Sequence, residues 1–272
     1  MTGRRRPDLR VFDDAAALAD AGAALFIDTV RQQAAAPGRF AVALAGGSTP
    51  KSLYARLAGL AEAPDLPWPR MHFFWGDERH VPPDHPDSNA RMASEALLDR
   101  VPIEPTQIHR IKAELPSPQD AAADYEAELR QFFRLAPGEW PRFDLVLLGL
   151  GADAHTASLF PGTPALAEAS RLVVASRVEP PGVDRITLTA PALNHGARVV
   201  FLVAGETKAD AVAAVIDGAW QPNRYPAQLI RPTGGDLIWL LDRTAASKLS
   251  PRGGSTPPVR GPSGSWRASP GR

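Results

Sequence analysis

The sequence contains no cysteine, which excludes disulfide bonds, thiolate nucleophiles and cysteine-based zinc sites. Long apolar runs are also lacking. The longest, such as residues 199–204, fall far short of the roughly 18 to 20 apolar residues that a membrane-spanning helix needs. Arg4 to Arg6 are followed by acidic side chains that interrupt any signal-peptide-like apolar segment. We therefore expect a cytoplasmic protein without a membrane partner.

An excess of charge of either sign is absent too, because 30 Lys and Arg residues balance 30 Asp and Glu residues. The overall charge thus gives no argument for binding nucleic acid. The one biased segment is residues 248–272, which is rich in Pro, Gly, Ser and Arg. We expect it to be a disordered, solvated tail, because it has too little apolar surface to offset the entropy of ordering. A weak contact of its arginines with nucleic acid or an acidic partner is the less favoured alternative.

Three common catalytic signatures are missing as well. The chain has no His-Glu-x-x-His metal spacing, no Walker phosphate loop and no G-x-S-x-G nucleophile elbow. Ser158 is therefore a poor candidate for a nucleophile. We expect neither a bound metal nor a cofactor.

The remaining pattern alternates short apolar runs with helical periodicity over residues 8–247. This alternation is typical of an α/β fold with a mostly parallel sheet that is covered on both faces. Strands are predicted at residues 9–12, 40–44, 71–75, 143–148, 171–175, 185–189, 198–203 and 236–241. Helices are predicted at residues 14–33, 50–60, 88–98, 119–133 and 206–216.

Residues 149–162, GLGADAHTASLFPG, follow a predicted buried strand and are the most informative stretch. They place Asp153 and His155 at the carboxyl edge of the sheet, where open α/β sheets bind ligands. Gly149, Gly151 and Ala154 also match a dinucleotide-binding spacing, but Pro161 stops the long helix which that motif requires. His155 is therefore the best candidate for a general base.

A second glycine-containing loop lies at residues 45–50, AGGSTP, between a predicted strand and a predicted helix. Gly46 and Gly47 let the backbone approach a ligand, and free N–H groups at a helix start favour phosphate or carboxylate. A plain helix cap through Ser48 or Thr49 explains the residues equally well. Both interpretations stay open from the residues alone.

Charged side chains also lie at the ends of other predicted strands or loops. Asp77 and Arg79 follow the strand at 71–75, Arg185 begins the strand at 185–189, and Lys208 lies at a helix start. An arginine can grip an oxyanion with two parallel hydrogen bonds, and Asp77 can orient a hydroxyl or a base. A lysine in the first turn opposes the helix dipole, so a bound anion would explain it. The alternative is that the charges at residues 77–79 pair with each other at the surface, and this fits Glu78 better than Asp77 or Arg79.

Taken together, these stretches resemble the bacterial type of 6-phosphogluconolactonase. The matching segments, which span roughly residues 10–245, are AGGSTP at 45–50, WGDER at 75–79, DSNA at 87–90, GLGADAHTASLFP at 149–161, RITL at 185–188 and GETK at 205–208. The resemblance implies a Rossmann-like three-layer α/β/α sandwich. It also implies hydrolysis of 6-phospho-D-glucono-1,5-lactone in the oxidative pentose phosphate pathway.

The same resemblance implies roles for individual residues. His155 would be the general base, with Asp153 orienting it and Asp77 contacting the substrate or His155. The phosphate and the sugar oxygens would be held by Gly46, Gly47, Ser48, Arg79, Arg185 and Lys208. The chain departs from the family pattern at one position: Ala154 stands where the family usually has glycine. We expect activity to survive this change, because alanine has the smallest side chain after glycine.

Two other functions are weighed against this one. Glucosamine-6-phosphate deaminases resemble the chain in fold, but their histidine is usually followed by Ile-Ala-Phe-Asn, and Asp-Glu-Tyr replaces Asp77 to Arg79. A sugar-phosphate sensor would need a DNA-binding module, which neither the segment before the first strand nor the tail supplies. The sequence does not determine the oligomeric state.

Overall fold

The computed structural model describes residues 7–34, 38–61, 66–178 and 182–251. Its centre is a six-stranded sheet of order β1-β9-β8-β5-β2-β3, in which every neighbouring pair is parallel. The strands are β1 (Asp8–Phe12), β2 (Phe40–Leu44), β3 (Met71–Trp75), β5 (Leu145–Leu148), β8 (Arg198–Val203) and β9 (Asp236–Asp242). The predicted α/β fold with a mostly parallel sheet is confirmed.

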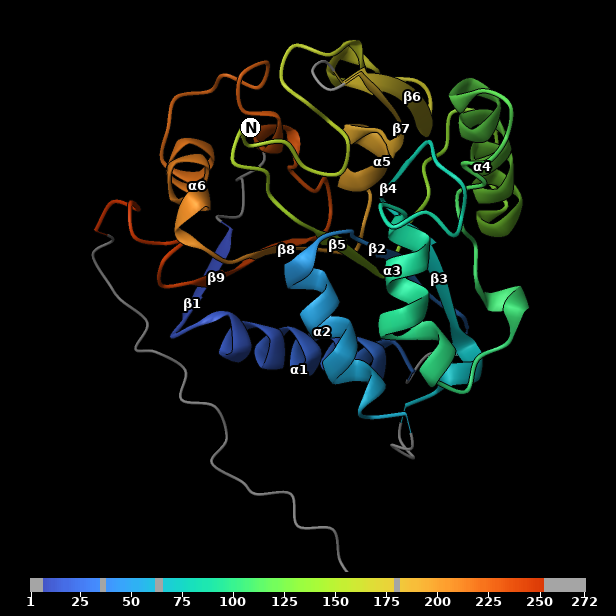
Figure 1. The fold of residues 1–272 in the computed structure, drawn as a ribbon, viewed down its shortest axis with the longest axis horizontal. Coiled ribbons are helices and arrows are strands. Elements are labelled where there is room, and N and C mark those ends of the chain that lie inside the picture. The colour runs from blue at the N-terminus through green and yellow to red at the C-terminus, as the bar shows by residue number, and fades with distance from the viewer. Residues whose placement is uncertain (1–6, 35–37, 62–65, 179–181, 252–272) are drawn as a thin grey trace, which may run out of the picture.

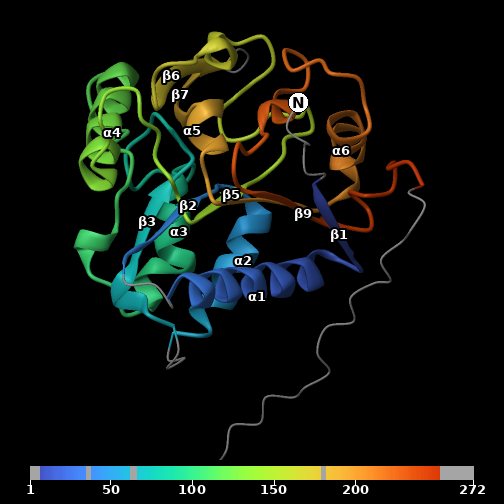
Figure 2. The same cartoon turned by 180° about the vertical axis from the view of Figure 1, so that it is seen from behind.

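Helices cover both faces of this sheet and make the three layers (Figures 1 and 2). On one face lie α1 (Ala15–Ala34), α2 (Ser48–Ala58) and α3 (Asn89–Ala96), and on the other lie α5 (Ala190–Asn194) and α6 (Ala209–Ile216). Every residue of β2 and of β5 is buried, as expected for strands covered on both sides. Short 3-10 turns occur at Trp68–Arg70, Leu98–Arg100, Pro105–Gln107, Pro164–Ala167, Glu206–Lys208 and Pro226–Leu229.

A second sheet of three antiparallel strands packs with α4 (Pro118–Phe133) above the main sheet. It consists of β4 (Asp77–Arg79), β7 (Val183–Leu188) and β6 (Val173–Val178), in that order. The sequence predicted two of its strands, but neither this separate sheet nor the short elements β4 and α5. β4 was missed because three consecutive charged residues carry no strand periodicity.

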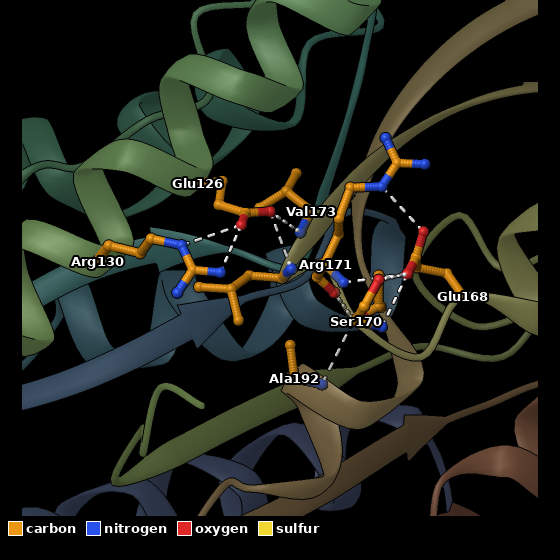
Figure 3. A network of polar contacts seen from close by, with 9 residues as sticks. Glu126, Arg130, Glu168, Ser170, Arg171, Val173 and Ala192 are labelled. Carbon is orange, nitrogen blue, oxygen red and sulfur yellow. Dashed lines mark hydrogen bonds and ion pairs between the residues drawn. The ribbon is translucent and has the colours of Figure 1, made fainter. Parts of the chain in front are cut away.

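Two glutamates hold the second sheet in place (Figure 3). Glu126 on α4 accepts hydrogen bonds from the backbone N–H groups of Leu172 and Val173 at the start of β6, and it also pairs with Arg130. Glu168 accepts from the N–H groups of Ser170 and Arg171 in the turn just before β6. These contacts anchor β6 and, through the ladder, β7 with its Arg185.

The order of the main sheet reverses between β2 and β5. The chain leaves β2 through α2 towards β3, whereas it leaves β5 towards β8 on the opposite side. Open α/β sheets bind ligands in the crevice outside the carboxyl ends of the strands at such a reversal. The loops that begin at Ala45 and Gly149 flank this crevice.

At the end of the described chain, residues up to Ser250 keep contacts with the rest of the protein. Lys248 forms an ion pair with Asp210 on α6, and the Ser250 N–H donates to Asp217. The remainder of the predicted tail, residues 252–272, lies outside the described residues. None of the helices in the described part of the chain has both the length and the apolar character of a membrane span.

Candidate active site

A cavity of about 220 Å³ opens at the carboxyl edge of the main sheet, where the strand order reverses. Loops that follow β2, β3, β5 and β8 line it together with β7. All but one of the predicted site residues contribute to this lining: Gly46, Gly47, Ser48, Asp77, Arg79, His155, Arg185 and Lys208. The exception is Asp153, which contacts the cavity residue His155 instead.

The His155 imidazole is held by Asp153. The distance between His155 Nδ1 and Asp153 Oδ1 is 2.5 Å, so Nδ1 carries the proton that is donated to the carboxylate. In the neutral imidazole, Nε2 is then the nitrogen with a free lone pair, which can accept a proton. Partial burial raises the pKa of the Asp153 carboxyl, but the hydrogen bond and charge of His155 outweigh this effect and lower it overall. The pair has the arrangement of a general base with its orienting carboxylate.

The backbone around this pair is tightly turned. A Cβ at Gly151 would overlap the His155 ring and the Asp153 carboxylate, so only glycine fits there. The Gly151 N–H donates to the His155 carbonyl at 2.8 Å, and Thr156 Oγ1 donates to the Gly149 carbonyl at 2.9 Å. Ala154 between them has a φ of 63°, in the left-handed region that favours glycine.

Asp77 is buried and oriented by two side chains. Ser158 Oγ donates to Asp77 Oδ2 at 2.6 Å, and Asn89 Nδ2 donates to the Asp77 carbonyl at 3.0 Å. The expectation that Ser158 is no nucleophile agrees with this geometry, because its hydroxyl is buried and already donates to Asp77. Asp77 therefore faces the cavity as a fixed hydrogen-bond acceptor.

The expectation of a surface ion pair for Glu78 is wrong. Its side chain is buried and accepts hydrogen bonds from Ser88 Oγ and from the backbone N–H groups of Arg79, Asn89 and Ala90. Burial raises the pKa of the Glu78 carboxyl, although the backbone donors oppose this shift. Glu78 belongs to β4, and its carboxylate lies at the N-terminus of α3. Its hydrogen bonds thus connect this helix to β4.

Asn89 is a cavity residue that the sequence analysis did not single out, although it lies in the matched segment DSNA. Its carboxamide packs against Gly46 so closely that a Cβ at Gly46 would overlap Asn89 Oδ1. Gly46 is thus required by the side chain of the first residue of α3. No local pattern marks Asn89, because its contacts come from residues 43 and 12 positions away in the chain.

The loop after β2 presents its backbone to the cavity. α2 begins at Ser48, and its N-cap is Gly47 with a φ of 99° and no capping side chain. The alternative that Ser48 or Thr49 caps the helix is therefore wrong. The first N–H groups of α2 lie at the cavity, where an anion can accept their hydrogen bonds.

Arg79 and Arg185 face each other across β4 and β7 as direct partners in the ladder. Like charges in this arrangement repel, and the Nε atoms of both arginines are buried without a hydrogen-bond partner among the described residues. Burial lowers the pKa of Arg185, and the nearby charge of Arg79 lowers it further. Lys208 reaches the same cavity from the loop after β8. Such a group of cations is suited to a bound anion.

A family model described as Glucosamine-6-phosphate isomerases/6-phosphogluconolactonase matches residues 13–239. The chain belongs to this family. The resemblance inferred from the motifs is thereby confirmed, and so is the fold that it implied.

Individual relatives agree with the family assignment. The 6-phosphogluconolactonase of Nostoc sp. is 48% identical over 225 residues, which cover 82% of this chain and 89% of the relative. That of Mycobacterium tuberculosis is 39% identical over 89% of this chain and 98% of the relative. The structure of 6-phosphogluconolactonase from Trypanosoma brucei has a TM-score of 0.76 at 32% identity, covering 90% of this chain and 99% of that one.

Proposed function

We propose that this chain is an enzyme that hydrolyses 6-phospho-D-glucono-1,5-lactone to 6-phosphogluconate, a step of the oxidative pentose phosphate pathway. One observation carries the proposal: a histidine held by a carboxylate shares a cavity with Arg79, Arg185 and Lys208. The named relatives at 39% and 48% identity support the same reaction. A monomeric glucosamine-6-phosphate deaminase shares the fold at 20% identity, which carries no argument about the reaction.

The substrate is a phosphorylated sugar lactone, and the cationic side chains of the cavity bind its phosphate group. The phosphate oxygens bind to Arg79, Arg185 and Lys208, while the N–H groups of Gly47 and Ser48 donate from the start of α2. The phosphate thereby positions the lactone ring beside His155 and Asp77.

His155 acts as the general base. Its Nε2 removes a proton from a water molecule while the water oxygen attacks the lactone carbonyl carbon C1. Asp153 stabilises the imidazolium that forms, through its hydrogen bond to Nδ1. The C1 to ring-oxygen bond then breaks, and the departing ring oxygen takes the proton from Nε2 to become the C5 hydroxyl. The new carboxylic acid releases its own proton to solvent.

This mechanism needs no covalent intermediate and no cofactor. A lactone is an activated ester, so general-base assistance of about 10² to 10⁴-fold together with positioning is sufficient. The cytoplasmic location inferred from the sequence stays a prediction.

The test compares lactone hydrolysis by the wild type and by His155→Ala, with the uncatalysed rate subtracted. We expect the substitution to lower kcat about 10² to 10⁴-fold while the protein stays folded, because the side chain is partly exposed. Thermal unfolding of both proteins serves as the control. A wild-type rate equal to background would contradict the function, and an unchanged variant would contradict the mechanism.

A further inference from the structure

Phe160 contacts two residues that have different roles in the candidate active site. Its ring stacks on the His155 imidazole, with the ring centroids 4.0 Å apart and the planes inclined by 24°. The guanidinium carbon of Arg185 lies 5.7 Å from the centroid of the same ring. Among the described residues, the cavity lining includes His155 and Arg185 but not Phe160. Phe160 therefore acts through its neighbours.

The imidazole needs a second restraint besides Asp153. A hydrogen bond at Nδ1 holds one edge of the ring but leaves the plane free to tilt about that bond. Stacking on Phe160 restrains the plane. The direction of Nε2 thus depends on Asp153 and Phe160 together.

Phe160 is itself held firmly. Its carbonyl accepts hydrogen bonds from the Thr163 backbone N–H at 3.3 Å and from Thr163 Oγ1 at 2.8 Å. The preceding Leu159 is fully buried and bridges to Thr156 in the same loop. These contacts fix the backbone on both sides of Phe160 and so the position from which its ring projects.

We propose that Phe160 is a positioning residue for His155, whose ring sets the imidazole plane so that Nε2 faces the lactone carbon. The inference rests on the proposed function. The contact with Arg185 is the weaker of the two, because 5.7 Å is close to the limit of about 6 Å for an attraction between a cation and an aromatic ring. The orientation of the general base His155 therefore depends on Phe160 more than phosphate binding by Arg185 does.

The kinetic test uses Phe160→Leu and Phe160→Tyr with two substrates, the 6-phospholactone and D-glucono-1,5-lactone, which lacks the phosphate. We expect Phe160→Leu to lower kcat about tenfold or more for both lactones by a similar factor, with little change in KM, because misplaced catalytic groups cost rate. Phe160→Tyr keeps an aromatic face and restores most of the rate. A loss confined to the phosphorylated lactone would assign the residue to Arg185 and overturn the proposal, as would an unchanged kcat.

A second measurement follows the imidazole without using activity. In NMR spectra, the ring current of Phe160 shifts the His155 ring protons upfield; their signals are assigned with a His155→Gln variant. We expect this shift to vanish in Phe160→Leu and to persist in Phe160→Tyr. His155 signals that do not move in Phe160→Leu would overturn the proposal.

The matched control is a second stacked pair away from the cavity, Trp140 on His195, with centroids 5.4 Å apart. Trp140→Leu should move the His195 signals and leave both hydrolysis rates unchanged. A fall in either rate would overturn the claim that the loss of rate is specific to Phe160. Wild-type protein that hydrolyses neither lactone would contradict the proposed function, whereas the NMR comparison would still decide whether Phe160 fixes the imidazole.

Discussion

At the scale of single residues, the backbone and the side chain of Ala154 have opposite effects on the stability of the fold. Its φ of 63° costs an L-residue about 1 to 2 kcal/mol relative to glycine. Its methyl group, however, is fully buried and contributes about 0.8 kcal/mol of apolar burial. The strain is tolerated because hydrogen bonds on both sides, to Gly151 and from Ala227, fix this conformation.

Replacing this alanine tests the balance. We expect Ala154→Gly to raise the free energy of unfolding by up to about 1 kcal/mol and to leave lactone hydrolysis within a few-fold of the wild type. Ala154→Val is the control, and it should be clearly destabilised because a β-branched residue rarely adopts positive φ. Denaturant unfolding and initial rates check both variants. An inactive wild type beside an active Ala154→Gly would contradict the expectation that Ala154 permits activity.

At the scale of elements, two helices each use a tyrosine hydroxyl to hold a strand end. Tyr54 on α2 accepts from the Ala45 N–H at 2.9 Å and donates to the Ala45 carbonyl at 2.8 Å, just after β2. Tyr125 on α4 makes the same two bonds to Trp75 at the end of β3. Burial raises the pKa of both hydroxyls, which keeps them protonated and able to donate. The loops that line the cavity start directly after these fixed positions.

Removal of the Tyr54 hydroxyl should lower the free energy of unfolding and weaken substrate binding. Tyr54→Phe leaves the buried N–H and C=O of Ala45 without partners, and we expect a loss of about 2 to 4 kcal/mol in the free energy of unfolding. KM should rise, because Ala45 precedes the loop at Gly46, which we propose binds the phosphate. Tyr225→Phe is the control, since Tyr225 is only half-buried and packs against Arg224. Equal effects of the two substitutions would count against the role given to Tyr54.

At the scale of the whole molecule, zero net charge coexists with a local excess of positive charge. The second sheet brings Arg79 and Arg185 face to face, and the loop after β8 adds Lys208 to the same cavity. Folding therefore creates a repulsion that a bound anion relieves. On the proposed function, we expect the protein without a ligand to be less stable than its complex with a phosphorylated ligand.

Anion binding should accordingly raise the melting temperature. At about 100 times its Kd, 6-phosphogluconate should stabilise the wild type by about 2.7 kcal/mol, or about 5 to 10 °C in Tm. Arg185→Gln should lose most of this shift, while its Tm without ligand should not fall, because one of two facing cations is gone. Sodium chloride at matched ionic strength is the control. The same shift with chloride, or in the variant, would contradict a specific anion site.

Much of the fold and the centre of the site followed from local patterns. β2, β3 and β8 have the predicted bounds, because each is a mostly apolar run between polar loops. His155 and the glycine loops were found for a related reason: in a parallel sheet every strand points its carboxyl end at one edge, so residues that follow strands must gather there.

The remaining features depend on contacts between distant segments. The facing of Arg79 and Arg185, the burial of Glu78 under α3, and the packing of Asn89 on Gly46 join residues that no local period relates. No sequence pattern predicted that Phe160 stacks on His155, because this contact arises from a tight turn rather than from a repeating element. Local sequence thus placed the chemistry at one edge of the sheet, whereas tertiary packing decided how the side chains there face one another.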